Sequence, residues 1–300
     1  MPSVIKTLTH KQLIRPPSFL PDNVHYEVLM GSVAYGVSGD TSDCDIYGFC
    51  IPPKEMIFPH LGGEIEGFGR NKKRFEQYQQ HHIEDKEDGK QYDVEIFNIV
   101  KYFSLLMENN PNIVDSIFVP QNCVLHCTQV GNIVRENRRE FLHKGCFPKF
   151  KGYAYSQLHK MSTKNPEVGS KREAVREKFG YDVKFAYHVV RLLNECEQIL
   201  TLHDIDLQRD NEQLKAIRRG EVKESEIREW ASGKEKTLEE LYTKSTLPWG
   251  PDEGKIKELL LNCLEHHYGS LDKCVVRQDK ACEALKKIQV ILDEVNNAQN

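Results

Sequence analysis

One stretch near the N-terminus, residues 26–51, constrains the fold more than any other part of the sequence. Its string YEVLMGSVAYGVSGDTSDCDIYGFCI opens with an apolar run, Tyr26–Met30, that is typical of a β-strand and leads directly into Gly31-Ser32. A small-residue stretch follows, long enough for a turn or two of helix. A polar turn then precedes a second apolar run that begins Asp43-Cys44-Asp45. The stretch therefore predicts two strands joined through a Gly-Ser turn.

The two aspartates of this stretch carry a chemical signal. Successive side chains of a strand alternate between its faces, so Asp43 and Asp45 project on the same face. Two carboxylates held side by side repel each other unless a cation lies between them, and Mg²⁺ is typically held by one or two carboxylates together with substrate phosphates. Upstream, Gly31 and Ser32 offer free N–H groups, a hydroxyl and a backbone that a phosphate can approach closely. Together these residues outline a nucleotidyl-transfer site.

The same residues resemble a known family. Gly31-Ser32 followed by Asp43-x-Asp45 resembles the G-S…D-x-D signature of the DNA polymerase β nucleotidyltransferase superfamily. The longer string GSVAYGVSGDTSDCDIYGF resembles the nucleotidyltransferases of the YcgL and RNA-ligase-associated (RlaP) type. Three later segments resemble motifs of that family in the same order: KYFSLLMENNPNIVDSIF (101–118), FGYDVKFAYHVVRLL (179–193), and Leu247-Pro248 followed by Asp252. The resemblance therefore spans nearly the whole chain.

The resemblance implies an α+β fold. A polymerase β-type nucleotidyltransferase domain, a mixed sheet with flanking helices, is expected over residues 1–143. A mainly helical domain over 144–300 would complete the nucleotide and acceptor cleft. The pattern of apolar residues agrees with this, because it indicates strands at 74–83 and 90–99 around the polar turn EDKEDG and changes to the helical period after residue 99.

A third carboxylate is expected on the strand at 90–99. Two Mg²⁺ ions about 3.5–4 Å apart need more than two carboxylates to hold and neutralise them. Asp93 and Glu95 lie two residues apart and face the same way, so the spacing alone leaves both open. The resemblance places the family's third acidic residue at Asp93. We therefore expect Asp43, Asp45 and Asp93 to be the catalytic and metal-binding acids, with Asp93 orienting or deprotonating the acceptor hydroxyl.

A cationic stripe is expected on the helix at 182–193. Lys184, His188 and Arg191 stand at i, i+4 and i+7, and therefore on one side of the helix, with apolar residues opposite. Such a stripe suits the phosphates of a nucleotide or the backbone of an RNA. The resemblance implies that these three residues neutralise the leaving pyrophosphate and that Tyr181 stacks on the base or sugar.

The remaining predicted binding residues are a phosphate turn and a basic run. The resemblance implies that Gly31 and Ser32 hold the triphosphate. The segment 164–178, KNPEVGSKREAVREK, is rich in Lys and Arg. A charge run of this kind is usually a solvated helix surface, but its place directly before the stripe favours contact with the acceptor. Its candidate acceptor-binding residues are Lys171, Arg172 and Lys178.

Composition limits the class of protein without identifying it. The 300 residues are 39% hydrophobic and 29% charged, as in an ordinary soluble protein. No run approaches the roughly 18 apolar residues of a membrane span. The nine cysteines are odd in number and lack a C-x-x-C pair, which favours reduced thiols and a cytoplasmic location. The net charge of −4 argues against indiscriminate nucleic-acid binding.

The function predicted from these observations is nucleotidyl transfer. A nucleoside monophosphate would pass from an NTP to an acceptor hydroxyl with release of pyrophosphate, assisted by two Mg²⁺ or Mn²⁺ ions. The resemblance implies an RNA 3′ end as acceptor, in repair or tailing. Protein nucleotidylation of the AMPylation type and small-molecule nucleotidylation remain open. A non-catalytic nucleotide-binding or antitoxin-like partner is the further alternative, although the intact G-S, D-x-D and third acid speak against it. The choice of NTP and the oligomeric state are not predicted.

Overall fold

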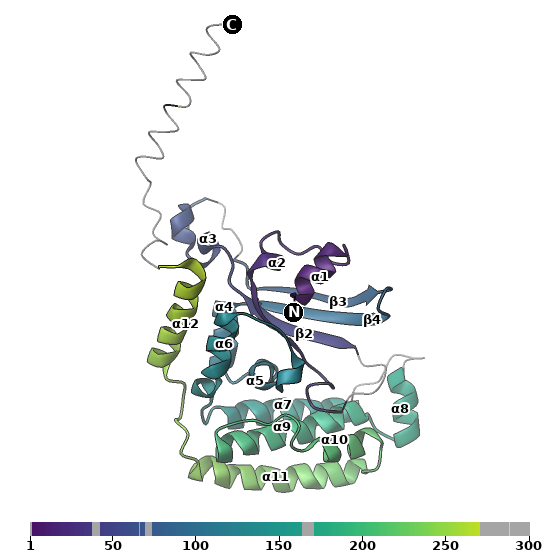
Figure 1. Ribbon diagram of the computed structural model, residues 1–300. Helices are drawn as coiled ribbons and strands as arrows, with labels where there is room; N and C mark the ends of the chain where they lie inside the picture. Colours follow the sequence, from purple (N-terminus) through teal and green to yellow (C-terminus); the bar gives the residue numbers. More distant parts are fainter. Residues whose placement is uncertain are drawn as a thin grey trace.

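The computed structural model describes residues 2–37, 43–65, 67–69, 74–163, 171–270 and 288. Its N-terminal half is built on a five-stranded sheet, and its C-terminal half is helical (Figure 1). The strand order is β3-β4-β2-β1-β5. The strands are β1 (Val24–Leu29), β2 (Cys44–Cys50), β3 (Gln77–Asp85), β4 (Lys90–Asn98) and β5 (Val124–Cys127). This arrangement confirms the predicted α+β fold with a mixed sheet.

The central strand pair brings the acidic residues together. Strand β2 runs parallel to β4, whereas the other neighbouring strands are antiparallel. In the β2–β4 register Asp45 lies beside Asp93, and Tyr47 lies beside Glu95. Because side chains alternate along each strand, all four residues face the same side of the sheet. On that face Phe49 belongs to the larger hydrophobic core.

The opposite face of the sheet is covered by the N-terminal segment. Helices α1 (Val4–His10) and α2 (Leu20–Asn23) pack there, with Ile5 and Leu20 against Ile46. The carboxylate of Glu27, on β1, is fully buried and accepts hydrogen bonds from the Ser3 hydroxyl and from the first amides of α1. Free amides at a helix N-terminus favour a negative charge. This contact anchors α1, which the sequence patterns do not predict.

The helical half is arranged around α9 (Val183–Leu202). This helix packs against α7 (Cys146–Thr163), α10 (Asn211–Arg218) and α11 (Glu224–Lys244). Its other described helices and those that connect it to the sheet are α3 (Lys54–Ile57), α4 (Ile99–Met107), α5 (Pro111–Phe118), α6 (Gln129–Glu136), α8 (Lys171–Phe179) and α12 (Glu253–Tyr268). Short 3₁₀ turns lie at Pro59–Gly62, Gln121–Cys123 and Arg138–Phe141. None of the helices within the described residues has the length and apolar character to cross a membrane.

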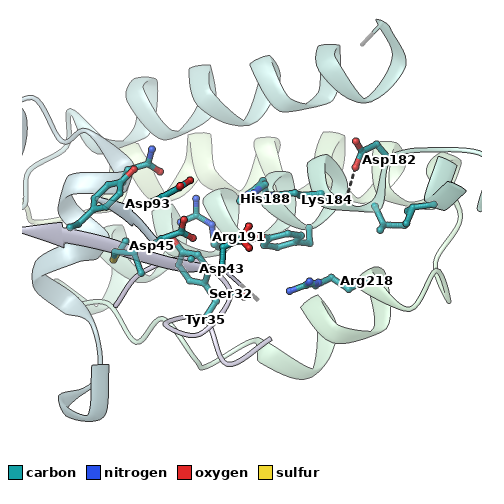
Figure 2. A pocket seen from close by; sticks show the side chains of 17 residues that line it. Ser32, Tyr35, Asp43, Asp45, Asp93, Asp182, Lys184, His188, Arg191 and Arg218 are labelled. Carbon is teal, nitrogen blue, oxygen red and sulfur yellow. Dashed lines mark hydrogen bonds between the residues drawn. The ribbon is translucent and has the colours of Figure 1, made fainter. Parts of the chain in front are cut away.

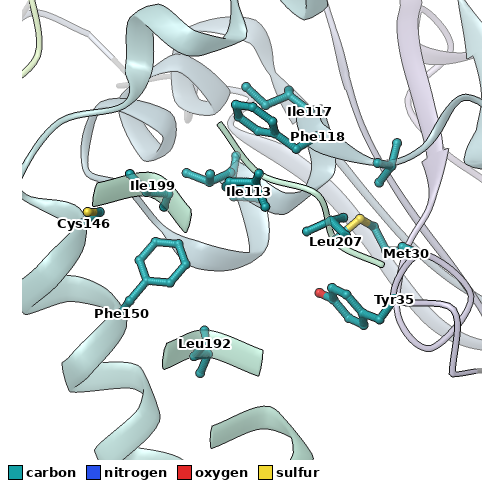
Figure 3. Packing of buried hydrophobic residues seen from close by; sticks show 14 of the residues in the cluster. Met30, Tyr35, Ile113, Ile117, Phe118, Cys146, Phe150, Leu192, Ile199 and Leu207 are labelled. Carbon is teal, nitrogen blue, oxygen red and sulfur yellow. The ribbon is translucent and has the colours of Figure 1, made fainter. Parts of the chain in front are cut away.

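One hydrophobic core joins the sheet to the helical half. Figure 3 shows Met30 and Tyr35, which follow β1, in the same hydrophobic cluster as Phe150 of α7 and Leu192 of α9. The core is therefore continuous across the predicted boundary at residue 143, and the division into two domains stays a prediction.

The predicted elements match the structure with local differences. The expected strands at 26–30, 43–51, 74–83 and 90–99 correspond to β1, β2, β3 and β4, although β3 begins at Gln77. The sequence also predicts an irregular stretch at 54–72, which in the structure contains α3 and a 3₁₀ turn. A helix predicted around 130–142 is divided into α6 and a 3₁₀ turn. The short strand β5 is not predicted. The sequence also predicts a last helix at 270–296, and apart from residues 270 and 288 this segment lies outside the described residues.

Candidate active site

The turn after β1 is closely fitted to the second aspartate. The amide of Met30 donates to the carbonyl oxygen of Asp45 at 2.7 Å, and Gly31 has a left-handed φ of +67°. A Cβ at this glycine would lie 2.1 Å from Asp45 Oδ2. A backbone amide at Val37 donates to Ser32 O at 2.8 Å and closes the turn. The expected helical stretch is therefore a series of hydrogen-bonded turns, and only glycine fits where it meets the carboxylate.

Three carboxylates converge on one cavity of about 580 Å³. Asp43 lies exposed just before β2, Asp45 lies within β2, and Asp93 lies on β4, and all three line the cavity with Gly31 and Ser32 (Figure 2). The structure thus brings together the predicted phosphate turn and the predicted acids, which come from separate parts of the sequence.

Glu95, the alternative third acid, is engaged elsewhere. Its carboxylate accepts a hydrogen bond from the hydroxyl of Tyr47, its neighbour across the β2–β4 pair. Tyr47 lines the cavity and Glu95 does not. Of the two acids that the spacing leaves open, Asp93 is therefore the one placed beside Asp45.

The three carboxylates of the cavity repel one another. Burial raises the pKa of the Asp45 carboxyl, and the Asp93 and Asp43 carboxylates raise this pKa further. Lys184 acts in the opposite direction and lowers it. A cation that binds between three neighbouring carboxylates in a partly buried site stabilises their ionised forms. The electrostatics of these carboxylates therefore favour a bound cation.

The cations of the predicted stripe lie across the cavity, on α9. Lys184, His188 and Arg191 all line it. Lys184 is exposed and forms no ion pair with the described part of the chain. The Asp182 side chain caps the helix by accepting from the Lys184 amide at 2.9 Å. His188 is half-buried, with its ring centroid 4.1 Å from that of Tyr187. The helix thus presents positive charge to the carboxylates of the sheet.

Arg191 differs from the other two residues of the stripe because it is only 4% exposed. Its guanidinium forms ion pairs with two buried acids, Asp115 on α5 and Glu195 one turn further along α9. It also stacks on the ring of Tyr35, 4.4 Å from the centroid, and the Tyr35 hydroxyl donates to Asp115 at 2.8 Å. Arg191 therefore connects α9 to the turn after β1, and its predicted contact with the triphosphate stays a prediction.

Arg218 is a cavity residue that sequence reasoning missed. It ends α10, donates to the carbonyl oxygen of Val37 at 2.5 Å, and lies 5.5 Å from the ring centroid of Tyr187. Figure 2 shows its guanidinium on the side of the cavity away from the three aspartates. The surrounding sequence, QLKAIRRG, offers no motif that separates this arginine from the other Lys and Arg residues.

Several predicted binding residues are not brought to the cavity. Tyr181 is 3% exposed, and its hydroxyl donates to the carbonyl oxygen of Val222, so its ring is not placed to stack on a nucleotide there. Lys178 lies over the ring of Phe179 and lines a different pocket. Lys171 and Arg172 begin α8, but their side chains lie outside the described residues.

The cavity can supply oxygen ligands to a metal ion. No three His, Cys, Asp or Glu side chains in the described part of the chain are already arranged to hold a metal ion. Mg²⁺ does not need such a cage, because it is usually held by one or two carboxylates, water and substrate phosphates. The oxygen donors of Asp43, Asp45 and Asp93, together with the raised pKa of Asp45, fit such an ion.

Known proteins resemble this chain in sequence and in fold. The model of the RlaP family, described as the RNA repair pathway DNA polymerase beta family, matches residues 7–260. No curated protein matches the chain. A nucleotidyltransferase-like protein from Exiguobacterium sibiricum 255-15 is similar in structure, with 12% identity and a TM-score of 0.29 over 87% of this chain and 72% of that one. A likeness this weak adds nothing about function. The match over most of its length shows that the chain belongs to the RlaP family of polymerase β-type nucleotidyltransferases.

Proposed function

We propose that this chain transfers a nucleoside monophosphate from an NTP to the 3′ hydroxyl of an RNA and releases pyrophosphate. One observation carries the proposal: three carboxylates on the sheet face the cations of α9 and α10 across a single cavity, with the Gly31-Ser32 turn between them. A nucleoside triphosphate needs both sides, because its phosphates are anionic and are usually bound together with Mg²⁺.

The reaction is an in-line displacement at the α-phosphorus. The acceptor oxygen forms a bond to this phosphorus, the bond to the β-phosphate breaks, and pyrophosphate leaves with the bonding electrons. The proton of the acceptor hydroxyl passes to Asp93 or to solvent. The protein contributes little covalent chemistry to this reaction. Catalysis therefore depends on positioning the reactants and on stabilising charge.

Five residues of the cavity have specific roles in this proposal. The carboxylates of Asp43, Asp45 and Asp93 would hold Mg²⁺, which when bound neutralises phosphate charge and favours ionisation of the acceptor hydroxyl. Amides of the turn at Gly31 would donate to the triphosphate. Lys184 would stabilise the negative charge that grows on the leaving pyrophosphate.

The choice of RNA as acceptor is supported by the family. Its description places it in an RNA repair pathway, and the chain matches it over residues 7–260. The proposal of a cytoplasmic enzyme is supported by the cysteine pattern of the sequence.

The test is incubation of the pure protein with Mg²⁺ or Mn²⁺ and each α-³²P-labelled NTP in three reactions, which contain total RNA, total protein or a small-molecule extract. The proposal expects label in RNA at its 3′ end. Label in protein or in a small molecule would establish transfer to another acceptor and overturn the RNA assignment. Label in none of the fractions would refute nucleotidyl transfer to these acceptor classes.

A matched pair of variants tests whether the labelling depends on this cavity. Asp45→Asn removes a carboxylate from the cavity, and Glu84→Gln removes an exposed carboxylate from β3 of the same sheet. Labelling should be lost in the first variant and kept in the second. Equal labelling by Asp45→Asn and the unmodified protein would place the activity elsewhere.

A further inference from the structure

A β-bulge lies directly beside the third carboxylate. In the β3–β4 pair Gln80 lies opposite Val94 and Ile83 lies opposite Tyr92. Two residues of β3, 81 and 82, therefore face the single residue Asp93 on β4. Bulges of this kind are common next to active sites, where the extra residue re-aims a side chain. The irregularity lies on the edge strand β3, beside the Asp93 that lines the cavity.

The backbone at the bulge has an unusual conformation. His82 has a φ of +55°, in the left-handed region that L residues other than glycine rarely adopt. In this conformation its amide donates to Asp93 Oδ1 at 2.7 Å. Strained backbone of this kind is often kept because it positions a functional group. Here the group that it positions is one of the three cavity carboxylates.

The neighbouring imidazole lies at the other carboxylate oxygen. Nδ1 of His81 is 3.3 Å from Asp93 Oδ2. Its second ring nitrogen, Nε2, lies 2.8 Å from the side-chain amide nitrogen of Gln79. Gln79 in turn accepts at its side-chain oxygen from the amide of Gln77, at 3.3 Å. These four side chains form a continuous polar row along β3 that ends at Asp93.

The order of donors along this row determines where the imidazole carries its proton. An amide NH₂ only donates hydrogen bonds, so Nε2 of His81 accepts from Gln79. A neutral imidazole that accepts at one nitrogen carries its proton on the other. Nδ1–H of His81 therefore faces the carboxylate of Asp93. The bulge gives one oxygen of Asp93 a backbone hydrogen bond and places Nδ1 of His81 3.3 Å from the other.

We propose that His81 is a positioning residue, which donates from Nδ1 to Asp93 and holds this carboxylate in the orientation that the acceptor hydroxyl requires. The inference rests on the proposed nucleotidyl transfer, because Asp93 is its acceptor-side acid. Removing a residue that orients a catalytic or metal-binding group commonly lowers activity or metal affinity by about 10- to 100-fold. The effect of His81 should lie in kcat, because in the proposed function the Gly31 turn and Lys184, rather than Asp93, contact the triphosphate.

Two substitutions at the same position separate this role from a merely structural one. The side-chain nitrogen of Asn is attached at the same carbon position as Nδ1 of His, whereas the nitrogen of Gln lies further out, near Nε2. His81→Asn keeps a donor facing Asp93 and should retain kcat within about threefold. His81→Gln moves the donor away and should lower kcat by on the order of tenfold with the KM for NTP unchanged. His10→Asn, an exposed position on α1, is the control.

The kinetic outcomes decide between the two roles. Equal loss in both His81 variants, or a rise in the KM for NTP that matches the loss, would overturn the positioning role. If the unmodified protein transfers no label, the proposed function fails on that ground alone, whatever the His81 variants do.

A second measurement tests the contact without reference to activity. Two-bond ¹H–¹⁵N correlation spectra of the unmodified protein, with the His81 signals assigned by their absence in His81→Asn, report which ring nitrogen carries the proton. A proton on Nδ1 supports the proposal, and a proton on Nε2 overturns it even in an active enzyme. This result also separates failure of the His81 contact from failure of the proposed function.

Discussion

Gly31→Ala tests the fit between the turn and the second aspartate. A Cβ at Gly31 would lie 2.1 Å from Asp45 Oδ2, whereas Cβ atoms are essentially never found closer than 3.0 Å to another heavy atom. The carboxylate oxygen must therefore retreat by about 1 Å, or the turn must shift by the same distance. Misplacing a catalytic group by about 1 Å can cost on the order of 100-fold in rate.

The substitution also strains the backbone, and this second effect needs its own control. A non-glycine residue in the left-handed region costs roughly 1–2 kcal/mol. Gly89, in the turn between β3 and β4, has a φ of +70°, close to the +67° of Gly31, but a Cβ there would meet no atom within 4 Å. Gly89→Ala therefore reproduces the strain without moving Asp45.

The assay compares kcat for transfer of labelled nucleotide with the melting temperature of each variant. Both alanine variants should melt a few degrees lower, since about 1 kcal/mol corresponds to roughly 2–4 °C in a chain of this order of size. Only Gly31→Ala should lose about 100-fold in kcat. Activity of Gly31→Ala within threefold of the unmodified protein, or equal loss in Gly89→Ala, would refute the argument that the glycine is required to accommodate Asp45.

Three further predictions concern the carboxylates and Lys184. Asp45→Asn should abolish transfer yet raise the melting temperature at pH 7. The folded-state pKa of Asp45 is raised, so its ionisation costs stability above that pKa, and the gain should vanish below about pH 4; a lower melting temperature at pH 7 would contradict this. Asp93→Ala should lose activity as Asp45→Asn does while Glu95→Ala remains mild, and the reverse ranking in the same assay would move the third acid by two residues. Lys184→Ala should raise the KM for Mg–NTP or lower kcat by about 10- to 100-fold, whereas Lys236→Ala, an exposed position on α11, should do neither; identical kinetics for the two would remove Lys184 from the site.

Local patterns were sufficient for the elements that carry the first half of the site. The alternation of side chains along a strand depends only on neighbouring residues, so the sequence alone predicts that Asp43 and Asp45 share a face. The glycine before Ser32 likewise indicates a turn without reference to the rest of the chain. These local rules, together with the family resemblance, also predict the mixed sheet and the helix at 182–193.

Only the tertiary structure decided which distant residues meet. The alternation of side chains along the strand does not distinguish Asp93 from Glu95, because both face the same way. The parallel register of β2 with β4 places Asp93 beside Asp45 and Glu95 beside Tyr47. A bulge in β3 then brings His81 to the same carboxylate. Such pairings depend on how strands align across long stretches of chain, which no local pattern encodes.

Tertiary packing also decided which cations on the helical side of the cavity are exposed and which are buried. The stripe on α9 looks uniform in sequence, yet Lys184 is exposed, whereas Arg191 turns inward to Asp115 and Glu195. A buried guanidinium requires buried acids as partners, and Asp115 comes from a helix far away in the sequence. Arg218 reaches the cavity because α10 packs against α9. The sequence by itself determined which residue types and local faces were available, and the packing of distant elements decided which charges face the cavity and which are buried with a partner.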